Sequence, residues 1–251
     1  MRLMAIWIDG MRAESPSSFK AAGWSAAGFA AGVRLALPAM PVMAVFGLAF
    51  GTAAAQNGLT PSEATLMSAL VFAGASQFIV VEMWSSAATV AGITAIGMVT
   101  AVVNMRLLLM SASLRPWLGA SPAWQTYPAI SLLTDPGWLL ISRYRSNGGA
   151  DAAAFLGSGV LLWLTWIAAT APGHALGSLM ADPKRFGLDL VMPCFFIVMI
   201  VPLWRGPRPA IPWVVAGAVA LLAAELMPAW WFIMAGAIAG SLAAGIIDES
   251  S

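Results

Sequence analysis

The chain has 251 residues, of which 60% are hydrophobic and 9% are charged, and its 12 Lys and Arg nearly balance its 11 Asp and Glu. A soluble domain carries about 25% charged residues, so this composition indicates a membrane protein. The nearly neutral charge offers no basic face to nucleic acid, which excludes a nucleic-acid-binding function.

The first residues do not have the pattern of a signal peptide. The apolar run LMAIWI after Arg2 is ended by Asp9, well short of the roughly 7–15 apolar residues of a signal-peptide core. We therefore expect residues 1–27 to be a retained cytoplasmic or interfacial segment. Residues 28–251 are expected to form a single transmembrane domain, because no later polar stretch is long enough to fold alone.

A helix needs about 20 mostly apolar residues to cross a bilayer. Candidate segments centre on residues 35–55, 66–84, 87–110, 127–142, 153–171, 188–204, 211–226 and 228–247. Their apolar runs are continuous and lack the strict alternation of barrel strands. The expected fold is therefore an all-α bundle of about seven or eight transmembrane helices.

The distribution of Lys and Arg predicts the orientation of the chain. Four of these residues precede the first span, namely Arg2, Arg12, Lys20 and Arg34, which predicts a cytoplasmic N-terminus. Eight simple crossings leave other basic residues outside, namely Arg106, Arg115, Lys184 and Arg185. The conflict eases if one segment is a re-entrant hairpin, for which residues 66–84 are the natural candidate.

Residues 66–84, LMSALVFAGASQFIVVEMW, contain polar groups in the middle of an apolar segment. Gly74 weakens the helix there. In hydrocarbon, Ser76 and Gln77 must face protein, water or a ligand. We expect a broken or re-entrant helix near residues 73–78. The alternative is that Gly74 and Ser76 are close-packing residues and that Gln77 bonds to a neighbouring helix.

Asn104 and Arg106 lie in VVNMRLLLM, near the end of the third candidate span. An arginine at this depth needs a carboxylate, carbonyl oxygens or water. The alternative is that its long side chain reaches the membrane interface.

Thr134, Asp135 and Pro136 lie within AISLLTDPGWLLI. Pro136 lacks a backbone donor and disfavours helix at Asp135, which predicts a second break near residues 134–137. A carboxylate at a broken intramembrane helix is a candidate proton or cation site, or a partner for Arg106. The alternative is a plain interfacial turn.

With these three clusters, the chain resembles the AzlC family, the large subunits of bacterial branched-chain amino-acid exporters. The matching features are FGLAFG at 46–51, AQNGLTPSEATLMSALVFAGASQF at 55–78, Asn104 with Arg106, and Thr134 with Asp135. FAGASQF is the most specific of them. Pro136 departs from the family pattern, in which an acidic residue more often follows the aspartate.

The resemblance implies a transporter subunit rather than an enzyme, located in the bacterial inner membrane and working with a small membrane subunit of the AzlD type. The substrate is expected to be a branched-chain or similar apolar amino acid, and neither a cofactor nor a metal is expected. The chain contains no P-loop pattern, so coupling to a proton or ion gradient is the more economical expectation.

The resemblance, joined to the rule that transporters bind substrates at broken helices, predicts the site residues. The expected substrate-binding residues are Phe72, Gly74, Ala75, Ser76, Gln77 and Phe78, with residues 74–77 unwound to hold the charged ends of the amino acid. The expected gating or ion-coupling residues are Asn104, Arg106, Thr134 and Asp135. We expect Arg106 and Asp135 to be electrostatically coupled.

Three other functions are compatible with parts of the pattern. These alternatives are a non-transporting assembly subunit, a simple channel, and an intramembrane serine protease with Ser76 as its nucleophile. The protease needs a base within hydrogen-bond reach of the serine. The only histidine is His174, at the far end of another span, which disfavours that chemistry.

Overall fold

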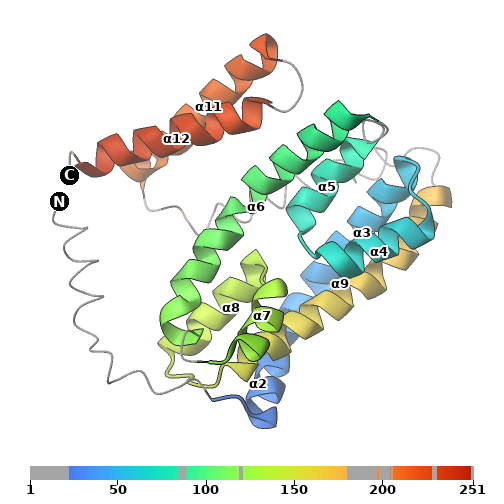
Figure 1. The fold of residues 1–251 in the computed structure, drawn as a ribbon, viewed down its shortest axis with the longest axis vertical. Helices are drawn as coiled ribbons and strands as arrows, with labels where there is room; N and C mark the ends of the chain where they lie inside the picture. The colour runs from blue at the N-terminus through green and yellow to red at the C-terminus, as the bar shows by residue number, and fades with distance from the viewer. Residues whose placement is uncertain are drawn as a thin grey trace.

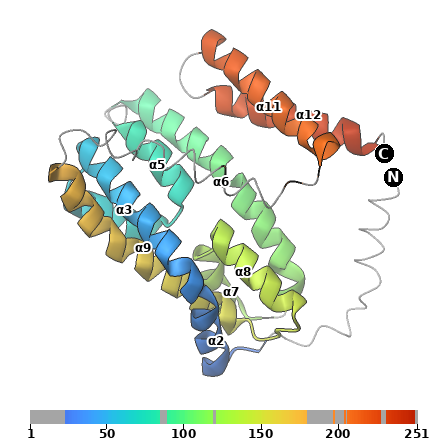
Figure 2. The ribbon, with the colours of Figure 1, turned by 180° about the vertical axis from the view of Figure 1, so that it is seen from behind.

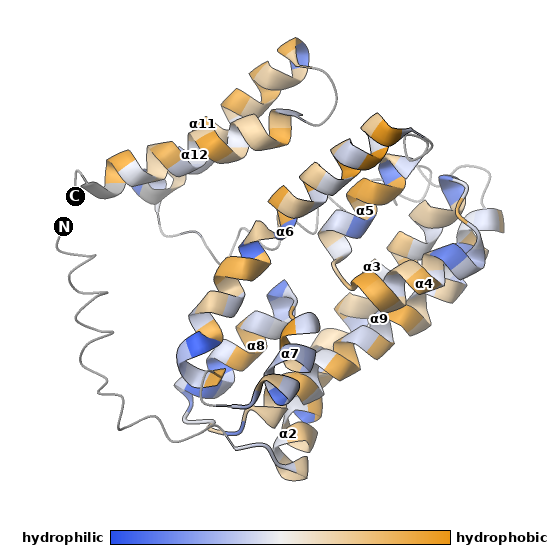
Figure 3. Ribbon diagram, in the orientation of Figure 1, coloured by the Kyte–Doolittle hydropathy of each residue, from blue (hydrophilic) through white to orange (hydrophobic). Residues whose placement is uncertain are grey.

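The structure is a computed structural model that describes residues 23–84, 89–118, 121–179, 206–227 and 231–249, together with Ile197 and Trp204. Within this part the regular structure is helical, and a single isolated bridge joins Gly23 to Asp151. The predicted all-α fold is confirmed (Figure 1). Figure 3 shows apolar residues along most of the helices. Residues 1–22 of the expected N-terminal segment and most of the candidate span 188–204 lie outside the described residues.

The described helices are α2 (Ala26–Ala36), the 3-10 turn η2 (Leu37–Ala39), α3 (Met40–Gln56), α4 (Pro61–Val71), α5 (Gly74–Glu82), α6 (Val90–Leu118), α7 (Ala123–Ser131), α8 (Asp135–Ser146), α9 (Ala153–Leu179), α11 (Pro207–Leu226) and α12 (Trp231–Glu249). Among the described residues, three stretches are long and apolar enough to cross a membrane: Ala26–Gln56, Val90–Leu118 and Ala153–Leu179.

The first and third of these stretches lie side by side and run parallel. At one end the Ser25 hydroxyl donates a hydrogen bond to Asp151, and at the other the Gln56 side chain donates to the Gly177 carbonyl at 3.4 Å. We call this pair, Ala26–Gln56 with Ala153–Leu179, the spine. Its end near Ser25 and Asp151 is end A, and its end near Gln56 and Gly177 is end B.

Glycines bring the two backbones of the spine into direct contact. A Cβ added to Gly32 would overlap the carbonyl oxygen of Ala154, and one added to Gly173 would overlap the carbonyl oxygen of Leu48. Small residues allow this approach in membranes, where close packing rather than water exclusion holds helices together. The spine therefore has a fixed register along its length.

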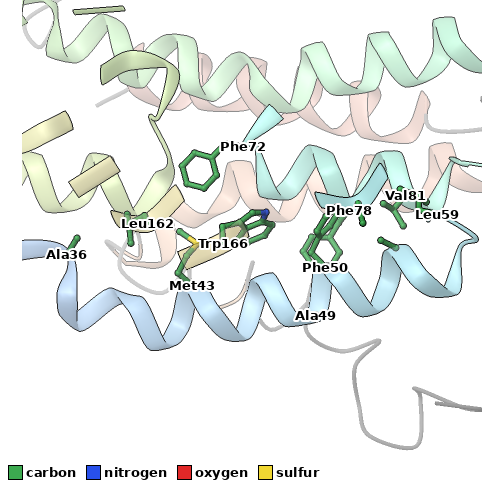
Figure 4. Packing of buried hydrophobic residues seen from close by; sticks show 12 residues of the cluster. Ala36, Met43, Ala49, Phe50, Leu59, Phe72, Phe78, Val81, Leu162 and Trp166 are labelled. Atoms are coloured by element: carbon green, nitrogen blue, oxygen red, sulfur yellow. The ribbon is translucent and has the colours of Figure 1, made fainter. Parts of the chain in front are cut away.

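Helices α4 and α5 form a re-entrant hairpin that enters from end B. The Thr60 backbone N–H donates to the Glu63 carboxylate at 2.8 Å and starts α4 with a capping box. The chain reverses at Phe72, whose φ is +33°. Leu59 and Val81, which flank the hairpin, share one end of a core cluster, whereas Phe72 lies at the other end near Leu162 (Figure 4). The 11 residues of α4 span about 16 Å, half of a roughly 30 Å hydrocarbon layer.

Helix α6 crosses from end B to end A, where α7 and α8 form a second re-entrant hairpin. The Trp24 indole N–H donates to the Ser121 hydroxyl at 2.8 Å, which places the start of α7 beside the start of the spine. Helix α8 ends at Ser146, a few residues before Asp151 at the same end. Both predicted helix breaks are therefore confirmed, and the two segments turn back within the bundle instead of crossing it.

Helices α11 and α12 pack mainly on each other, with Gly236 and Gly240 of α12 against Ala216 and Ala220 of α11. Both views of the ribbon show this pair apart from the spine (Figures 1 and 2).

The two hairpins change where the basic residues lie. Arg115 lies in the last turn of α6, and Arg143 and Arg145 lie in the last turn of α8, so all three gather at end A with Trp24 and Ser25. At end B the described charged residues include Glu63 and Glu82. The predicted conflict over orientation is therefore removed for Arg115, whereas Lys184 and Arg185 lie outside the described residues.

Candidate functional site

The tips of the two hairpins lie against the same part of α9. A Cβ on Gly74, at the start of α5, would lie 3.1 Å from the Trp166 ring, and a Cβ on Gly137, in the first turn of α8, would lie 3.9 Å from the Leu162 side chain. Four residues separate Leu162 from Trp166, which is about 6 Å along the helix axis. The tips therefore reach α9 from opposite ends at nearly the same depth.

Helix α6 brings the same two tips together on its own side. Asn104 contacts Ser76 of α5: its Nδ2 lies 3.3 Å from the Ser76 hydroxyl oxygen, and its Oδ1 lies 3.4 Å from the same oxygen. Arg106 forms an ion pair with Asp135 of α8, with 3.1 Å between Nη2 and Oδ2. Asn104 and Arg106 are two residues apart, which is about 3 Å along the axis of α6. We call the region of residues 72–77, 100–106, 134–137 and Trp166 the central site.

Helices α5 and α8 both begin at the central site, so their positive dipole ends point to it from opposite sides. Helix α8 is capped, because the Thr134 hydroxyl accepts the Gly137 N–H at 3.3 Å, and Pro136 has no N–H. Helix α5 has no side-chain cap, because its N-cap residue is Ala73. It therefore presents free backbone donors to the centre of the site.

The expected unwinding of residues 74–77 is wrong. The break lies at Phe72 and Ala73, and helical bonding resumes where the Gln77 N–H donates to the Ala73 carbonyl at 2.9 Å. The amides of Gly74, Ala75 and Ser76 precede that bond. These three amides therefore have no hydrogen-bond acceptor within α5.

Gln77 is the least satisfied polar side chain in the region. It is 0% exposed, and neither its Oε1 nor its Nε2 has a hydrogen-bond partner in the described part of the chain. The alternative in which Gln77 bonds to a neighbouring helix is therefore contradicted. The hydroxyl of Ser76, in contrast, donates to the Ala73 carbonyl at 2.8 Å.

The Arg106–Asp135 pair is also incompletely satisfied. The expected contact is present, but it joins one nitrogen to one oxygen and leaves Arg106 Nε and Asp135 Oδ1 without partners among the described residues. The Asp135 side chain is 8% exposed. A bidentate arginine–carboxylate pair would use both oxygens. This single contact leaves a donor and an acceptor available to a ligand.

Aromatic side chains pack behind the tip of the α4–α5 hairpin. The Trp166 ring stacks on Phe50 with centroids 5.8 Å apart, and Phe78 meets Phe50 edge-on at 5.7 Å. Figure 4 shows the Trp166 ring between the Phe50–Phe78 pair and Phe72. Phe72 and Phe78, both expected to bind the substrate, are buried in this cluster.

Two residues of the central site were not predicted. Thr100 Oγ1 and Trp166 Nε1 are buried without a partner in the described chain. Thr100 lies one helical turn before Asn104, and this spacing was the available signal. Trp166 lies in an apolar run, LLWLTWIAAT, and offered no signal that distinguished it from a core residue.

The structure does not bring His174 together with Ser76. His174 Nε2 lies 2.8 Å from the carbonyl oxygen of Leu59, at end B, and the Ser76 hydroxyl is bound to Ala73. The serine and the histidine are therefore engaged separately. No group of three or more His, Cys, Asp or Glu that could hold a metal occurs in the residues that the structure describes.

Residues 38–180, more than half of the chain, match the family described as AzlC protein. The chain belongs to the AzlC family. This family is a transporter-associated family generally linked to amino-acid transport, and the match covers α3 to α9 with both hairpins.

Similar proteins are membrane proteins without a stated activity. An uncharacterized membrane protein of Archaeoglobus fulgidus is 28% identical over 86% of this chain and 94% of its own length. An uncharacterized membrane protein of Helicobacter pylori strain J99 is 26% identical over 64% of this chain and 69% of its own length. No solved structure matches this AzlC-family protein at a significant level.

Proposed function

We propose that this AzlC-family protein exports branched-chain amino acids, with the central site as the place where the substrate binds. The proposal rests on one observation: hydrogen-bond donors and hydrogen-bond acceptors without partners lie together at one depth of the bundle. Donors are supplied by the α5 amides, Gln77 Nε2 and Arg106 Nε, and acceptors by Gln77 Oε1 and Asp135 Oδ1. An amino-acid zwitterion needs both.

A zwitterion would complete the hydrogen bonding that the protein leaves open. Its carboxylate suits the positive start of α5, as anionic groups suit the N-termini of broken helices in other transporters. Its ammonium suits the free oxygen of Asp135. Buried polar groups without partners are costly, so binding that satisfies them is favourable.

The orientation proposed is one in which end A faces the cytoplasm of a bacterial inner membrane. Support comes from the basic residues Arg115, Arg143 and Arg145 at end A and from the acidic residues Glu63 and Glu82 at end B. Cytoplasmic ends of membrane proteins carry an excess of Lys and Arg. The substrate then enters at end A and leaves at end B.

We further propose that transport is coupled to a proton or ion gradient and needs a small AzlD-type partner. Substrate binding or protonation of Asp135 would weaken its pair with Arg106, which provides the two arrangements that alternating access requires. A pure assembly subunit has little use for unpaired polar groups at membrane depth. A channel differs from this carrier because it neither saturates nor moves substrate uphill.

The proposal is tested by export from preloaded cells. Labelled valine, leucine, isoleucine and methionine are loaded into cells that express the chain with and without an AzlD-type partner. We expect saturable export of the branched-chain substrates with the partner, and loss of export in Gln77→Met. Export that is equal in cells without the chain, or that rises linearly with substrate, contradicts the carrier.

A further inference from the structure

A cavity of about 400 Å³ lies between α6 and α8 on the end-A side of the central site. It is lined by Ser113, Leu114, Trp138, Ser142, Arg145 and Ser146. Ser113 lies two turns beyond Arg106 on the same face of α6, and Trp138 lies one turn beyond Asp135 on α8. The cavity therefore continues the seam that the Arg106–Asp135 pair closes at the centre.

The charge in this cavity comes from Arg145. Its guanidinium lies over the Trp117 ring, 5.5 Å from the ring centroid. No described carboxylate forms an ion pair with it, whereas Arg106 has such a partner in Asp135. An arginine held on an aromatic ring, with its fork of N–H donors uncommitted, is suited to a carboxylate.

A hydrogen bond between two residues that line the cavity joins α6 to α8. The Trp138 indole N–H donates to the Ser113 hydroxyl at 2.9 Å, and that hydroxyl donates to the Met110 carbonyl at 2.6 Å. Helices α6 and α8 make little backbone contact, so polar links such as this one and the Arg106–Asp135 pair, with apolar side chains around them, join the two helices. Breaking these side-chain links leaves the backbone hydrogen bonds of both helices intact.

We propose that this cavity is an outer binding site for the substrate carboxylate at Arg145, and that the Trp138–Ser113 bond is the gate between it and the central site. The inference rests on the proposed amino-acid substrate. It adds a place where the substrate waits at end A, and it assigns roles to Arg145, Ser113 and Trp138.

The test uses the full-length protein in nanodiscs with Cys194→Ala, so that one introduced thiol is the only one. Ser142→Cys places it in the cavity, and Ser111→Cys, on α6 outside the cavity lining, is the matched control. Labelling rates are measured with an anionic sulfonatoethyl methanethiosulfonate and its cationic trimethylammonium counterpart. Protection is measured with leucine, with isovalerate, which lacks the ammonium, and with isoamylamine, which lacks the carboxylate.

We expect Arg145→Gln to lower the anionic-to-cationic rate ratio at residue 142 about tenfold, the effect of one charge about 6 Å away in water. Leucine and isovalerate at ten times their Kd should slow labelling about tenfold, and isoamylamine should not. The rate at residue 111 should change in neither experiment. An unreactive residue 142, an unchanged ratio, or equal protection by all three compounds overturns the outer site.

The gate has its own readout. Ser113→Ala removes the acceptor of the Trp138 N–H and keeps the indole ring in place, so we expect it to speed the labelling of Met110→Cys several-fold. An unchanged rate overturns the gate. If isovalerate protects residue 142 while the wild-type chain exports no amino acid, the outer site stands and the proposed function fails. If export occurs without protection, the inference alone fails.

Discussion

Replacing Gln77 with methionine should stabilise the substrate-free protein while abolishing export. The amide is 0% exposed and has two unpaired polar atoms in the described structure. Mutational data put the cost of such a buried unsatisfied group at about 1–3 kcal/mol. Methionine has a similar length without these atoms, so the free energy of unfolding should rise by about this amount, or about 2–4 °C in melting temperature per kcal/mol.

The assay is thermal unfolding of the purified protein in detergent, with and without leucine, together with export from cells. Wild type should gain stability with leucine, and Gln77→Met should start higher and gain nothing. Ser68→Ala is the matched control, because the Ser68 hydroxyl is equally buried but lies 2.8 Å from the Thr170 hydroxyl. That control should lower stability by about 0.5–1.5 kcal/mol and leave substrate binding intact.

The reasoning is refuted if Gln77→Met lowers the melting temperature as Ser68→Ala does and export continues at the wild-type rate. Such a result would mean that the amide has a structural partner and that the α5 tip does not contact the substrate.

Two further predictions concern the ion pair and the spine. In a cycle of Arg106→Gln, Asp135→Asn and the double variant, the double variant should lose no more transport than the worse single variant; a loss equal to the product of the single losses, in variants checked for membrane insertion, would show independent residues. Gly32→Ala should destabilise the protein by about 1–3 kcal/mol in thermal unfolding, because its Cβ overlaps the Ala154 backbone. Gly97→Ala, also helical but with open space around it, should be neutral or stabilising, and equal effects of the two changes would contradict the close packing.

The helix breaks were predictable because Gly74 and Pro136 are residue types that disfavour a continuous helix. The geometry of the breaks was not predictable. The reversal lies at Phe72, in a left-handed conformation that phenylalanine rarely adopts, so no local pattern indicates that position. Residues 66–84 are also long enough to cross a bilayer. Their two halves pack against α3, α6 and α9, and these tertiary contacts are not visible in the local sequence.

Contacts of the central site were predictable where a buried side chain is costly without a partner, because such a residue indicates that a partner must lie nearby. Arg106 and Asp135 are each expensive alone at membrane depth, which led to the expectation that they pair. Trp166 carries no comparable cost that a sequence reveals, and its unpaired N–H appears only once α5 is placed against α9. Glycine spacing such as GFAAG at 28–32 predicts close packing but does not identify the partner helix.

The parallel spine has a consequence for how the protein is made. The second helix of the spine, α9, begins roughly 100 residues after α3 ends. At 5–20 residues per second, the ribosome needs about 5–20 s to synthesise the chain between them. During that interval Ala26–Gln56 lies in the bilayer with its glycine face unmatched, and the α4–α5 hairpin lacks the surface on which its tip rests. Biogenesis therefore requires something to shelter these segments, whether lipid, the insertion machinery or a second membrane chain, until α9 arrives.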